Sequence, residues 1–283
     1  GLGDVYKRQV FRGGVPTSQH EAMRCPFQRG RFPGPVCYGY ISVGRIVGGD
    51  GLVGAPVFCL HPHQDRYVVP AAMTTPIPEG VPPGRAVLAA NLETALNGVW
   101  DARPGPGDDV VVIGAGIVGC LVAWLVGRIP GCRVQLIDID PAREATAAAL
   151  GVDFALPAQA RGEVDVLFHA SGAPAGLQTA LTLAGREATI IELSWYGDRP
   201  VSLPLGAHFH PRRLSIRCSQ VGTIPPDRAP RWDFSRRMGV VMRLLADPVL
   251  DVLINQESRF VDLPETFHHL DGALCHRVVY GPV

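Results

Sequence analysis

Neither sign of charge is in excess in this sequence, in which 26 Lys and Arg side chains balance 26 Asp and Glu. Without a basic surplus, nothing indicates nucleic acid or an anionic membrane surface as a partner. The sequence also lacks both an apolar run of about 18 residues and a secretory signal, so the cytoplasm is the expected compartment. Its seven cysteines include no Cys-x-x-Cys pair and no metal-ligand spacing, which is typical of reduced thiols.

An initiator methionine is missing as well. The segment Asp4-Val5-Tyr6-Lys7-Arg8-Gln9 resembles the translation of a transposon-end adaptor used in preparing sequencing libraries. We therefore expect residues 1–9 to lie outside the natural fold, and the natural protein to begin further upstream. The alternative is an ordinary polar N-terminal tail.

The strongest motif is a glycine-rich turn between an apolar run and a helical segment. Residues 109–113, rich in β-branched side chains, precede Gly114-Ala115-Gly116-Ile117-Val118-Gly119, and an apolar helix is expected over 117–129. In such a turn the first glycine allows the bend, the second admits a pyrophosphate, and the third lets the helix pack on the strand. The helix N-terminus then offers N–H groups and a positive dipole end to the phosphates.

A second strand is expected over 133–138 and ends in Asp138. An acid about 20 residues beyond the first glycine is placed to bind the adenosine ribose hydroxyls, so NAD is expected in preference to NADP. Together the turn, the helix and the acid predict a Rossmann dinucleotide-binding unit. The alternative is a glycine-rich turn of some other α/β protein, with Asp138 as an ordinary strand-end acid.

Apolar strands and helices continue to alternate after Asp138. The expected elements are a helix over 141–150, a strand over 164–170, a helix over 173–183, and strands over 188–193 and 214–221. This alternation predicts a doubly wound parallel sheet covered on both faces, with its ligand at the carboxyl ends of the strands. Ser171 and Gly172 directly follow one such strand end.

Residues 10–85 differ in character, because glycine and proline recur every few positions. Short runs of strand composition over 38–47, 55–60 and 66–69 predict a small irregular β-barrel or sandwich. A helix expected over 85–102 leads to Pro104-Gly105-Pro106-Gly107, the predicted domain junction. Near the end of the chain, a helix over 234–245 and a strand over 274–280 are expected.

This order of parts resembles the medium-chain dehydrogenase/reductase superfamily. The resemblance rests on the β-rich front, a linking helix with Thr94, the glycine motif, and Asp138 followed by Pro141 and Arg143. The segment 35–47 is similar to the superfamily's Gly-His-Glu segment, and Gly39-Tyr40 within it is similar to the bacteriochlorophyllide dehydrogenase-like group.

The resemblance implies hydride transfer between a nicotinamide cofactor and a small alcohol or carbonyl substrate, and we expect a homodimer. It implies a GroES-like irregular β-barrel domain over 10–97, a Rossmann domain over 98–222, and a return to the first domain over 223–283. The implied cofactor-binding residues are Gly114, Gly116, Ile117, Val118, Gly119, Asp138, Arg143, Ser171 and Gly172.

The resemblance ends at the zinc ligands. Zinc-dependent members have a His where this chain has Tyr40 and a Cys where it has Ala90, and the segment expected to carry a further Cys would lie upstream. Because catalytic zinc needs three protein ligands and an open position, a metal-free enzyme is expected. The one competing arrangement is Cys59-x-His61-x-His63.

Tyr40, His63 and Thr94 are the candidates for proton chemistry. His61 and His63 would face the same way on an extended segment, although both could be surface or core-edge histidines. Tyr40 could donate to a substrate or be a buried tyrosine, and Thr94 could lie beside the cofactor or serve packing.

Glu93 and His169 are weaker candidates for the same chemistry. A zinc-dependent alcohol dehydrogenase, a methyltransferase and a nucleotide-sensing protein without chemistry stay open as alternatives.

Overall fold

The structure is a computed structural model that describes residues 10, 13–49 and 52–281; residues 1–9, with their adaptor-like segment, lie outside the described part. The chain divides into two compact units. The first unit contains the residues up to Ala90 and those from Phe234 onward, and the second is Asn91–Asp233. The domain boundaries expected from the sequence stay predictions. None of the helices in the described ranges is long and apolar enough to span a membrane.

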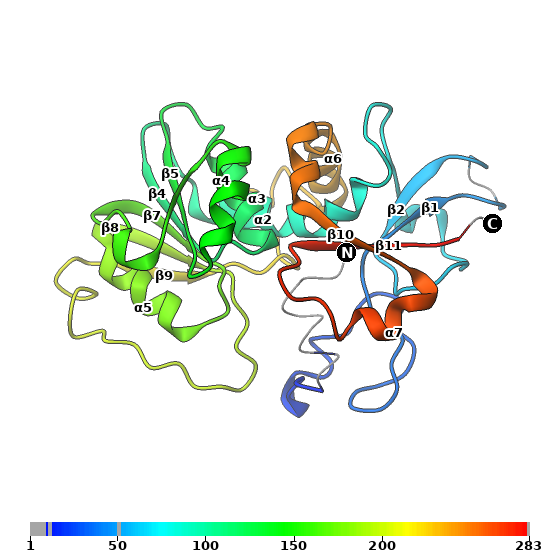
Figure 1. The fold of residues 1–283 in the computed structure, drawn as a ribbon, viewed down its shortest axis with the longest axis horizontal. Coiled ribbons are helices and arrows are strands. Elements are labelled where there is room, and N and C mark those ends of the chain that lie inside the picture. The colour runs from blue at the N-terminus through cyan, green and yellow to red at the C-terminus, as the bar shows by residue number, and fades with distance from the viewer. Residues whose placement is uncertain (1–9, 11–12, 50–51, 282–283) are drawn as a thin grey trace. The chain divides into compact units, whose positions relative to one another are not determined.

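A six-stranded parallel sheet forms the centre of the second unit (Figure 1). Its strand order is β6-β5-β4-β7-β8-β9, so the chain begins in the middle, moves out to one edge, and then returns to build the other half. The strands are β4 (Asp109–Ile113), β5 (Arg133–Ile137), β6 (Asp153–Ala155), β7 (Val164–His169), β8 (Ala184–Glu192) and β9 (Ser215–Cys218). This order confirms the predicted doubly wound sheet.

Helices connect these strands on both faces of the sheet. They are α3 (Ile117–Val126), α4 (Glu144–Leu150) and α5 (Pro174–Leu183), and α2 (Ala89–Ala102) precedes β4. Right-handed crossovers place α3 and α4 on one face and α5 on the other, because the strand order reverses between β4 and β7. The helix α3 ends three residues before the predicted position, because the chain turns at Gly127, whose N–H still bonds to the carbonyl of Ala123.

The core of the second unit explains why the sequences of its strands are continuously apolar. Val111, Leu167 and Ile190, from β4, β7 and β8, are fully buried and pack with Leu181 of α5. Each such side chain contributes about 1.5–3 kcal/mol of transfer free energy on burial. The buried strands therefore provide a rigid platform whose carboxyl ends present the loops.

The first unit contains two small sheets among its described residues. One is antiparallel and contains β1 (Ser42–Arg45), β2 (Pro56–Cys59) and β3 (Thr74–Pro76). The other pairs β10 (Ile254–Arg259) with β11 (Cys275–Val279) in parallel, and α7 (Leu263–Thr266) lies in the connection between them. The helix α6 (Phe234–Leu244) precedes them, and β10 was not expected from the sequence.

Arg85 ties the C-terminal segment to the front of the chain. Its side chain is 5% exposed, and its Nε and Nη2 donate to the two carboxylate oxygens of Asp251 at 2.8 and 2.6 Å. Its Nη1 donates to the carbonyls of Leu245 and Ala246, just beyond α6. One guanidinium therefore satisfies backbone and carboxylate acceptors that lie about 160 residues away in sequence, and its hydrogen bonds lower the pKa of Asp251.

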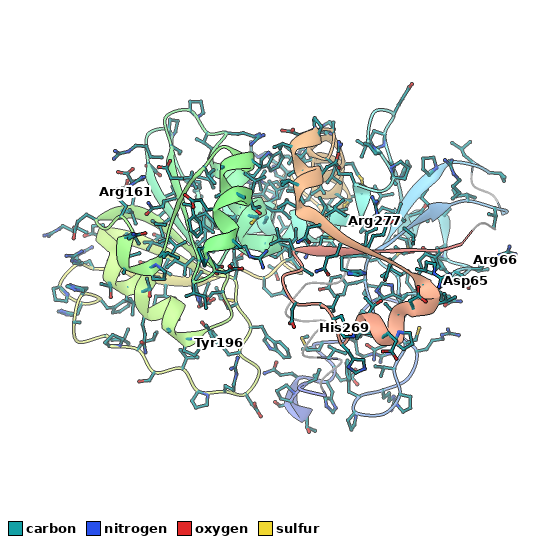
Figure 2. The ribbon with its side chains drawn as sticks, viewed as in Figure 1. Asp65, Arg66, Arg161, Tyr196, His269 and Arg277 are labelled. Atoms are coloured by element: carbon teal, nitrogen blue, oxygen red, sulfur yellow. The ribbon has the colours of Figure 1, made fainter. Side chains whose placement is uncertain are left out.

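The predicted strand over residues 66–69 is wrong. Figure 2 labels Asp65 and Arg66. Asp65 accepts a hydrogen bond from the backbone N–H of Arg66 at 2.8 Å, and Gln64 donates to the Arg66 carbonyl. Side chains therefore occupy backbone groups that a strand would pair with a neighbour. Val68 is 97% exposed, so its apolar character reflects no buried strand face.

Candidate functional site

The glycine turn joins β4 to α3, and each glycine has its own geometric reason. Gly114 has a positive φ of 104°, and a Cβ built on it would lie 2.6 Å from the backbone nitrogen of Ser171. A Cβ on Gly119 would lie 1.8 Å from the carbonyl oxygen of Gly114, so only glycine lets α3 lie against the turn. A Cβ on Gly116, by contrast, would meet nothing within 4 Å. The second glycine thus faces open space where a phosphate can approach the backbone.

The first turn of α3 follows this open space directly. Gly116 is the N-cap residue and makes no side-chain capping bond, while Ile117 is buried and anchors the helix. Val118 is half-buried. The N–H groups of a helix's first turn have no partners within the helix, and its dipole is positive there. This helix end fits the negative charge of a pyrophosphate.

Asp138 lies at the carboxyl end of β5, beside the glycine turn. Its Oδ2 accepts a hydrogen bond from the backbone N–H of Ala115 at 2.7 Å, and its Oδ1 accepts one from the N–H of Asp140 at 3.0 Å. Arg143 lies on the next short turn, where its Nε pairs with Asp140 at 3.3 Å. Asp138 therefore braces the turn with one oxygen while its half-buried carboxylate stays at the edge that a ribose would reach.

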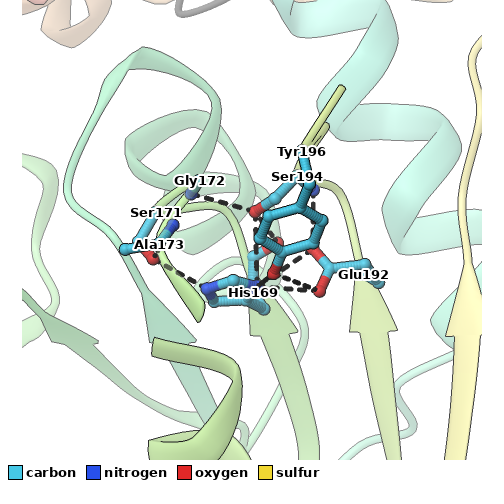
Figure 3. A network of polar contacts seen from close by, with 7 residues as sticks. All are labelled: His169, Ser171, Gly172, Ala173, Glu192, Ser194 and Tyr196. Atoms are coloured by element: carbon cyan, nitrogen blue, oxygen red, sulfur yellow. Dashed lines mark hydrogen bonds and ion pairs between the residues drawn. The ribbon is translucent and has the colours of Figure 1, made fainter. Parts of the chain in front are cut away.

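Polar side chains gather at the carboxyl ends of β7 and β8 (Figure 3). His169, the last residue of β7, is fully buried, and its Nδ1 lies 2.9 Å from both carboxylate oxygens of Glu192, the last residue of β8. Its Nε2 lies 2.7 Å from the hydroxyl of Ser171, and Gly172 donates its N–H to the hydroxyl of Ser194. Ser171 and Gly172 therefore belong to a hydrogen-bonded network that the parallel pairing of β7 with β8 assembles.

The opposite end of the same sheet is held by structural ion pairs. Arg161 pairs with Asp109 and with Asp153, the first residues of β4 and β6. Figure 2 labels Arg161 at this end of the sheet and Tyr196, which follows β8, at the other. The candidate ligand-binding groups of the second unit therefore lie at the end with the glycine turn, where the ligand of a parallel sheet is expected.

In the first unit, His61 is a packed core residue. Its ring stacks on Tyr67 with a centroid distance of 3.6 Å and lies 5.4 Å from the ring of Phe27. Its Nδ1 lies 2.9 Å from the carbonyl of Pro62, and burial lowers its pKa. A neutral imidazole held between two rings is a structural histidine.

In the first unit, His63 lies against Gly39, the residue directly before Tyr40. A Cβ on Gly39 would be 3.0 Å from Cδ2 of His63, so the residue before Tyr40 contacts that imidazole. The Nδ1 of His63 lies 3.5 Å from the hydroxyl of Tyr280, near the end of the chain. Burial raises the pKa of Tyr280 to about 12. Both His63 and Tyr40 are half-buried, and the Nε2 atom of His63 is itself buried.

The third catalytic candidate, Thr94, lies half-buried on α2 and belongs to the second unit. Glu93, beside it on the same helix, is buried. The roles predicted for Tyr40, His63 and Thr94 stay predictions.

Cys59, His61 and His63 do not form a metal site. Burial raises the pKa of the Cys59 thiol, which opposes the thiolate that zinc prefers, and the His61 ring is enclosed by aromatic side chains. Across the residues that the structure describes, no three His, Cys, Asp or Glu side chains are placed to hold a metal ion. The expected metal-free chemistry itself stays a prediction.

Comparisons with known proteins find dehydrogenases as relatives, although no protein-family model matches the chain. D-guloside 3-dehydrogenase of Escherichia coli K12 is 26% identical over 264 residues, which cover 83% of this chain and 75% of that protein. Alcohol dehydrogenase TADH from Thermus sp. ATN1 has a similar fold, with a TM-score of 0.75, 20% identity, and coverage of 98% of this chain and 89% of its own. An E. coli alcohol dehydrogenase in complex with NADH has a TM-score of 0.66, 21% identity, and coverage of 83% and 80% respectively.

These similarities support the resemblance to the medium-chain dehydrogenase/reductase superfamily that the sequence indicated. The chain is an oxidoreductase, which confirms the assignment made from the sequence, and the E. coli enzyme of similar fold binds NADH.

Four residues of the candidate sites escaped sequence reasoning or were ranked too low. His169 was ranked as a weak candidate, while Glu192, Tyr196 and Tyr280 were not considered. A polar residue that ends an otherwise apolar strand is the signal that could have found Glu192, because buried acids need partners. Tyr280 contacts His63 from the far end of the chain, and no local pattern announces that contact.

Proposed function

We propose that this chain is an NAD-dependent dehydrogenase that transfers hydride between the cofactor and a hydroxyl-bearing carbon of a sugar-like alcohol, without a catalytic metal. The observation that carries the proposal is the pairing of the open glycine turn at Gly116 with Asp138 at the end of β5. The named relative D-guloside 3-dehydrogenase supports a sugar-type substrate. A homodimer is part of this proposal, and light scattering of the purified protein would check it.

The second unit would hold the two halves of the dinucleotide on either side of the glycine turn. The turn and the N-terminus of α3 would bind the pyrophosphate, and Asp138 would accept hydrogen bonds from the adenosine ribose. Ile139, which is 85% exposed beside Asp138, would offer an apolar surface to the adenine. When bound, the nicotinamide accepts or returns the hydride.

NAD is proposed over NADP because a 2′-phosphate would meet the Asp138 carboxylate. Arg143 is the cation nearest along the chain that could offset this repulsion, but its guanidinium already pairs with Asp140. A carboxylate that accepts from ribose hydroxyls favours the unphosphorylated cofactor.

The hydroxyl proton must leave when the hydride does, and the first unit supplies candidates for that step. His63 would take the proton on a ring nitrogen, and Tyr40 would orient the substrate hydroxyl. Tyr280, whose hydroxyl lies 3.5 Å from Nδ1 of His63, would keep the imidazole oriented. Zinc does not fit the ligand positions of its relatives, because Tyr40 and Ala90 stand there.

The test is a panel of sugar alcohols, simple alcohols and aldehydes, read by the absorbance of reduced nicotinamide with NAD or NADP. We expect turnover with a polyhydroxylated substrate, loss of most of it in His63→Asn, and retention in the packed control His61→Phe. Metal analysis should find no stoichiometric zinc, and a strong chelator should leave that turnover unchanged. Stoichiometric zinc with chelator-sensitive turnover would overturn the metal-free mechanism. Absence of turnover across the panel, with NADH still bound, would favour a nucleotide-sensing protein.

A further inference from the structure

The buried pair of His169 and Glu192 has a role that hydride transfer alone does not assign. Glu192 accepts from three donors: Nδ1 of His169 at 2.9 Å, the hydroxyl of Tyr196 at 3.0 Å, and the backbone N–H of Ser194 at 2.7 Å. A carboxylate accepts from all three without a proton of its own. Burial, together with the Glu192 carboxylate, raises the pKa of Tyr196, so that phenol stays a donor. In the network of Figure 3, the Glu192 carboxylate is therefore the common acceptor for donors from His169, Ser194 and Tyr196.

This bonding decides the direction of the Ser171 hydroxyl. In the tautomer whose Nδ1 donates to Glu192, Nε2 of His169 is an acceptor, and it takes the hydroxyl hydrogen of Ser171 across 2.7 Å. The oxygen of Ser171 also accepts the N–H of Ala173 at 3.2 Å. A hydroxyl oxygen accepts twice, so one lone pair stays available to an outside donor. Ser171 is held as an acceptor.

The order serine, histidine, acid is also that of a hydrolytic triad, and the packing of α5 decides against that use. A Cβ on Gly176 would lie 2.4 Å from Oγ of Ser171 and 2.6 Å from Nε2 of His169, so the helix covers the bond between them. His169 is 0% exposed. An imidazole enclosed in this way can orient the hydroxyl but cannot pass a proton to a leaving group.

The location of Ser171 indicates which ligand group would donate a hydrogen bond to its hydroxyl oxygen. A Cβ on Gly114 would lie 2.6 Å from the backbone nitrogen of Ser171, so this serine borders the glycine turn. Asp138 borders the same turn from the β5 side, and β7 lies on the other side of β4. A dinucleotide bound across the reversal of strand order has its adenosine half on one side and its nicotinamide half on the other.

We propose that His169 and Glu192 are positioning residues that fix Ser171 as a hydrogen-bond acceptor for the ribose of the nicotinamide half. The inference rests on the proposed function, since it needs a dinucleotide at the turn. It separates the two halves of the cofactor: Asp138 serves the adenosine ribose, and the buried network serves the other ribose.

The experiment titrates the ligand-free protein with NADH and, separately, with ADP, by calorimetry. Ser171→Ala should weaken NADH about fivefold, the effect of one neutral hydrogen bond, and leave ADP within about twofold. His169→Phe keeps the serine hydroxyl but removes its orientation, and should weaken NADH by a similar factor, again with ADP retained. Ser215→Ala, the same chemical change at an exposed position on β9, is the matched control and should change neither ligand.

Thermal unfolding of each ligand-free variant separates a positioning role from lost packing. A loss confined to NADH in Ser171→Ala supports the proposal even where His169→Phe fails to fold. Equal weakening of NADH and ADP, or no weakening of either, would overturn it. Covalent labelling of Ser171 by a fluorophosphonate would also overturn it, in favour of hydrolytic chemistry. An unmutated protein that binds neither ligand would refute the proposed function itself, an outcome distinct from the others.

Discussion

Replacing Asp138 by Ser tests the cofactor assignment most directly. The half-buried Asp138 carboxylate would lie about 5 Å from a 2′-phosphate that carries nearly two negative charges, and Coulomb repulsion in a water-like dielectric is then about 2 kcal/mol. The substitution also removes the hydrogen bonds that the carboxylate would accept from the NAD ribose, which are worth about 1.5 kcal/mol. The variant should therefore shift the ratio of NADP to NAD affinity by about 300-fold, since every 1.4 kcal/mol is tenfold.

A second effect of the same substitution follows from the contact with Ala115. The Oδ2 atom of Asp138 accepts that N–H at 2.7 Å, and a serine side chain, one heavy atom shorter, leaves the N–H without this acceptor. The glycine turn should lose about 1 kcal/mol, which lowers the Tm by about 2–4 °C for a chain of this size.

The assay is a fluorescence titration with NADH and NADPH, together with calorimetric unfolding of the ligand-free protein. Asp153→Asn removes one negative charge at the opposite end of the sheet, where Asp153 pairs with Arg161, and should leave the cofactor ratio unchanged. Equal affinity of the unmutated protein for the two cofactors would refute the role given to Asp138. So would a variant that keeps the original ratio, even if its Tm falls.

Three further outcomes are expected. Gly119→Ala should abolish NADH binding in a fluorescence titration, because its Cβ would lie 1.8 Å from the Gly114 carbonyl oxygen; normal binding would contradict the geometry of the turn. Arg85→Met should lower the free energy of unfolding by about 2 kcal/mol in urea, a value discounted because Asp251 is 58% exposed; an unchanged midpoint would mean that this contact does not hold the C-terminal segment. Burial lowers the pKa of His61, so the unfolded chain binds protons first as the pH falls below 6.5. Stability should therefore be full above pH 6.5 and decline by at most about 1.4 kcal/mol per pH unit toward the folded pKa, and His61→Phe should flatten that slope; parallel slopes would exclude His61 as the cause.

The part of the fold that could be predicted from the sequence is the part specified by residues that are close together along the chain. The run Asp109–Ile113, the glycine turn and α3 are adjacent in sequence and in space, so strand composition, glycine placement and helical periodicity specify them together. Asp138 could be predicted as well, because one crossover of about 20 residues brings the end of the second strand back to the turn. The alternation of strands and helices then determined the doubly wound sheet.

Local reasoning failed where side chains compete with the backbone or where elements are short. Residues 66–69 have strand composition, but Asp65 and Gln64 bond to the backbone of Arg66 instead. The strand β10 is polar at every position after Ile254 and pairs with β11 in parallel, a pairing that only the rest of the first unit can enforce. Composition alone carries little information about such strands, because their stability comes from neighbours that the sequence does not specify locally.

Only the tertiary structure decided which polar groups meet. Parallel pairing places His169 next to Glu192 although 22 residues lie between them along the chain, and close packing of α5 through Gly176 turns a serine–histidine–acid array into an enclosed positioning network. In the first unit, the stacking of Tyr67 made His61 structural, while Tyr280 came from the far end of the chain to His63. The sequence by itself predicted where the pyrophosphate and the adenosine ribose would bind, since that part of the site is made by one βαβ unit. Which acceptor each buried donor bonds to depended on contacts that exist only once the strands of the sheet have paired. Hydrogen-bond direction and burial are set by neighbours in three dimensions.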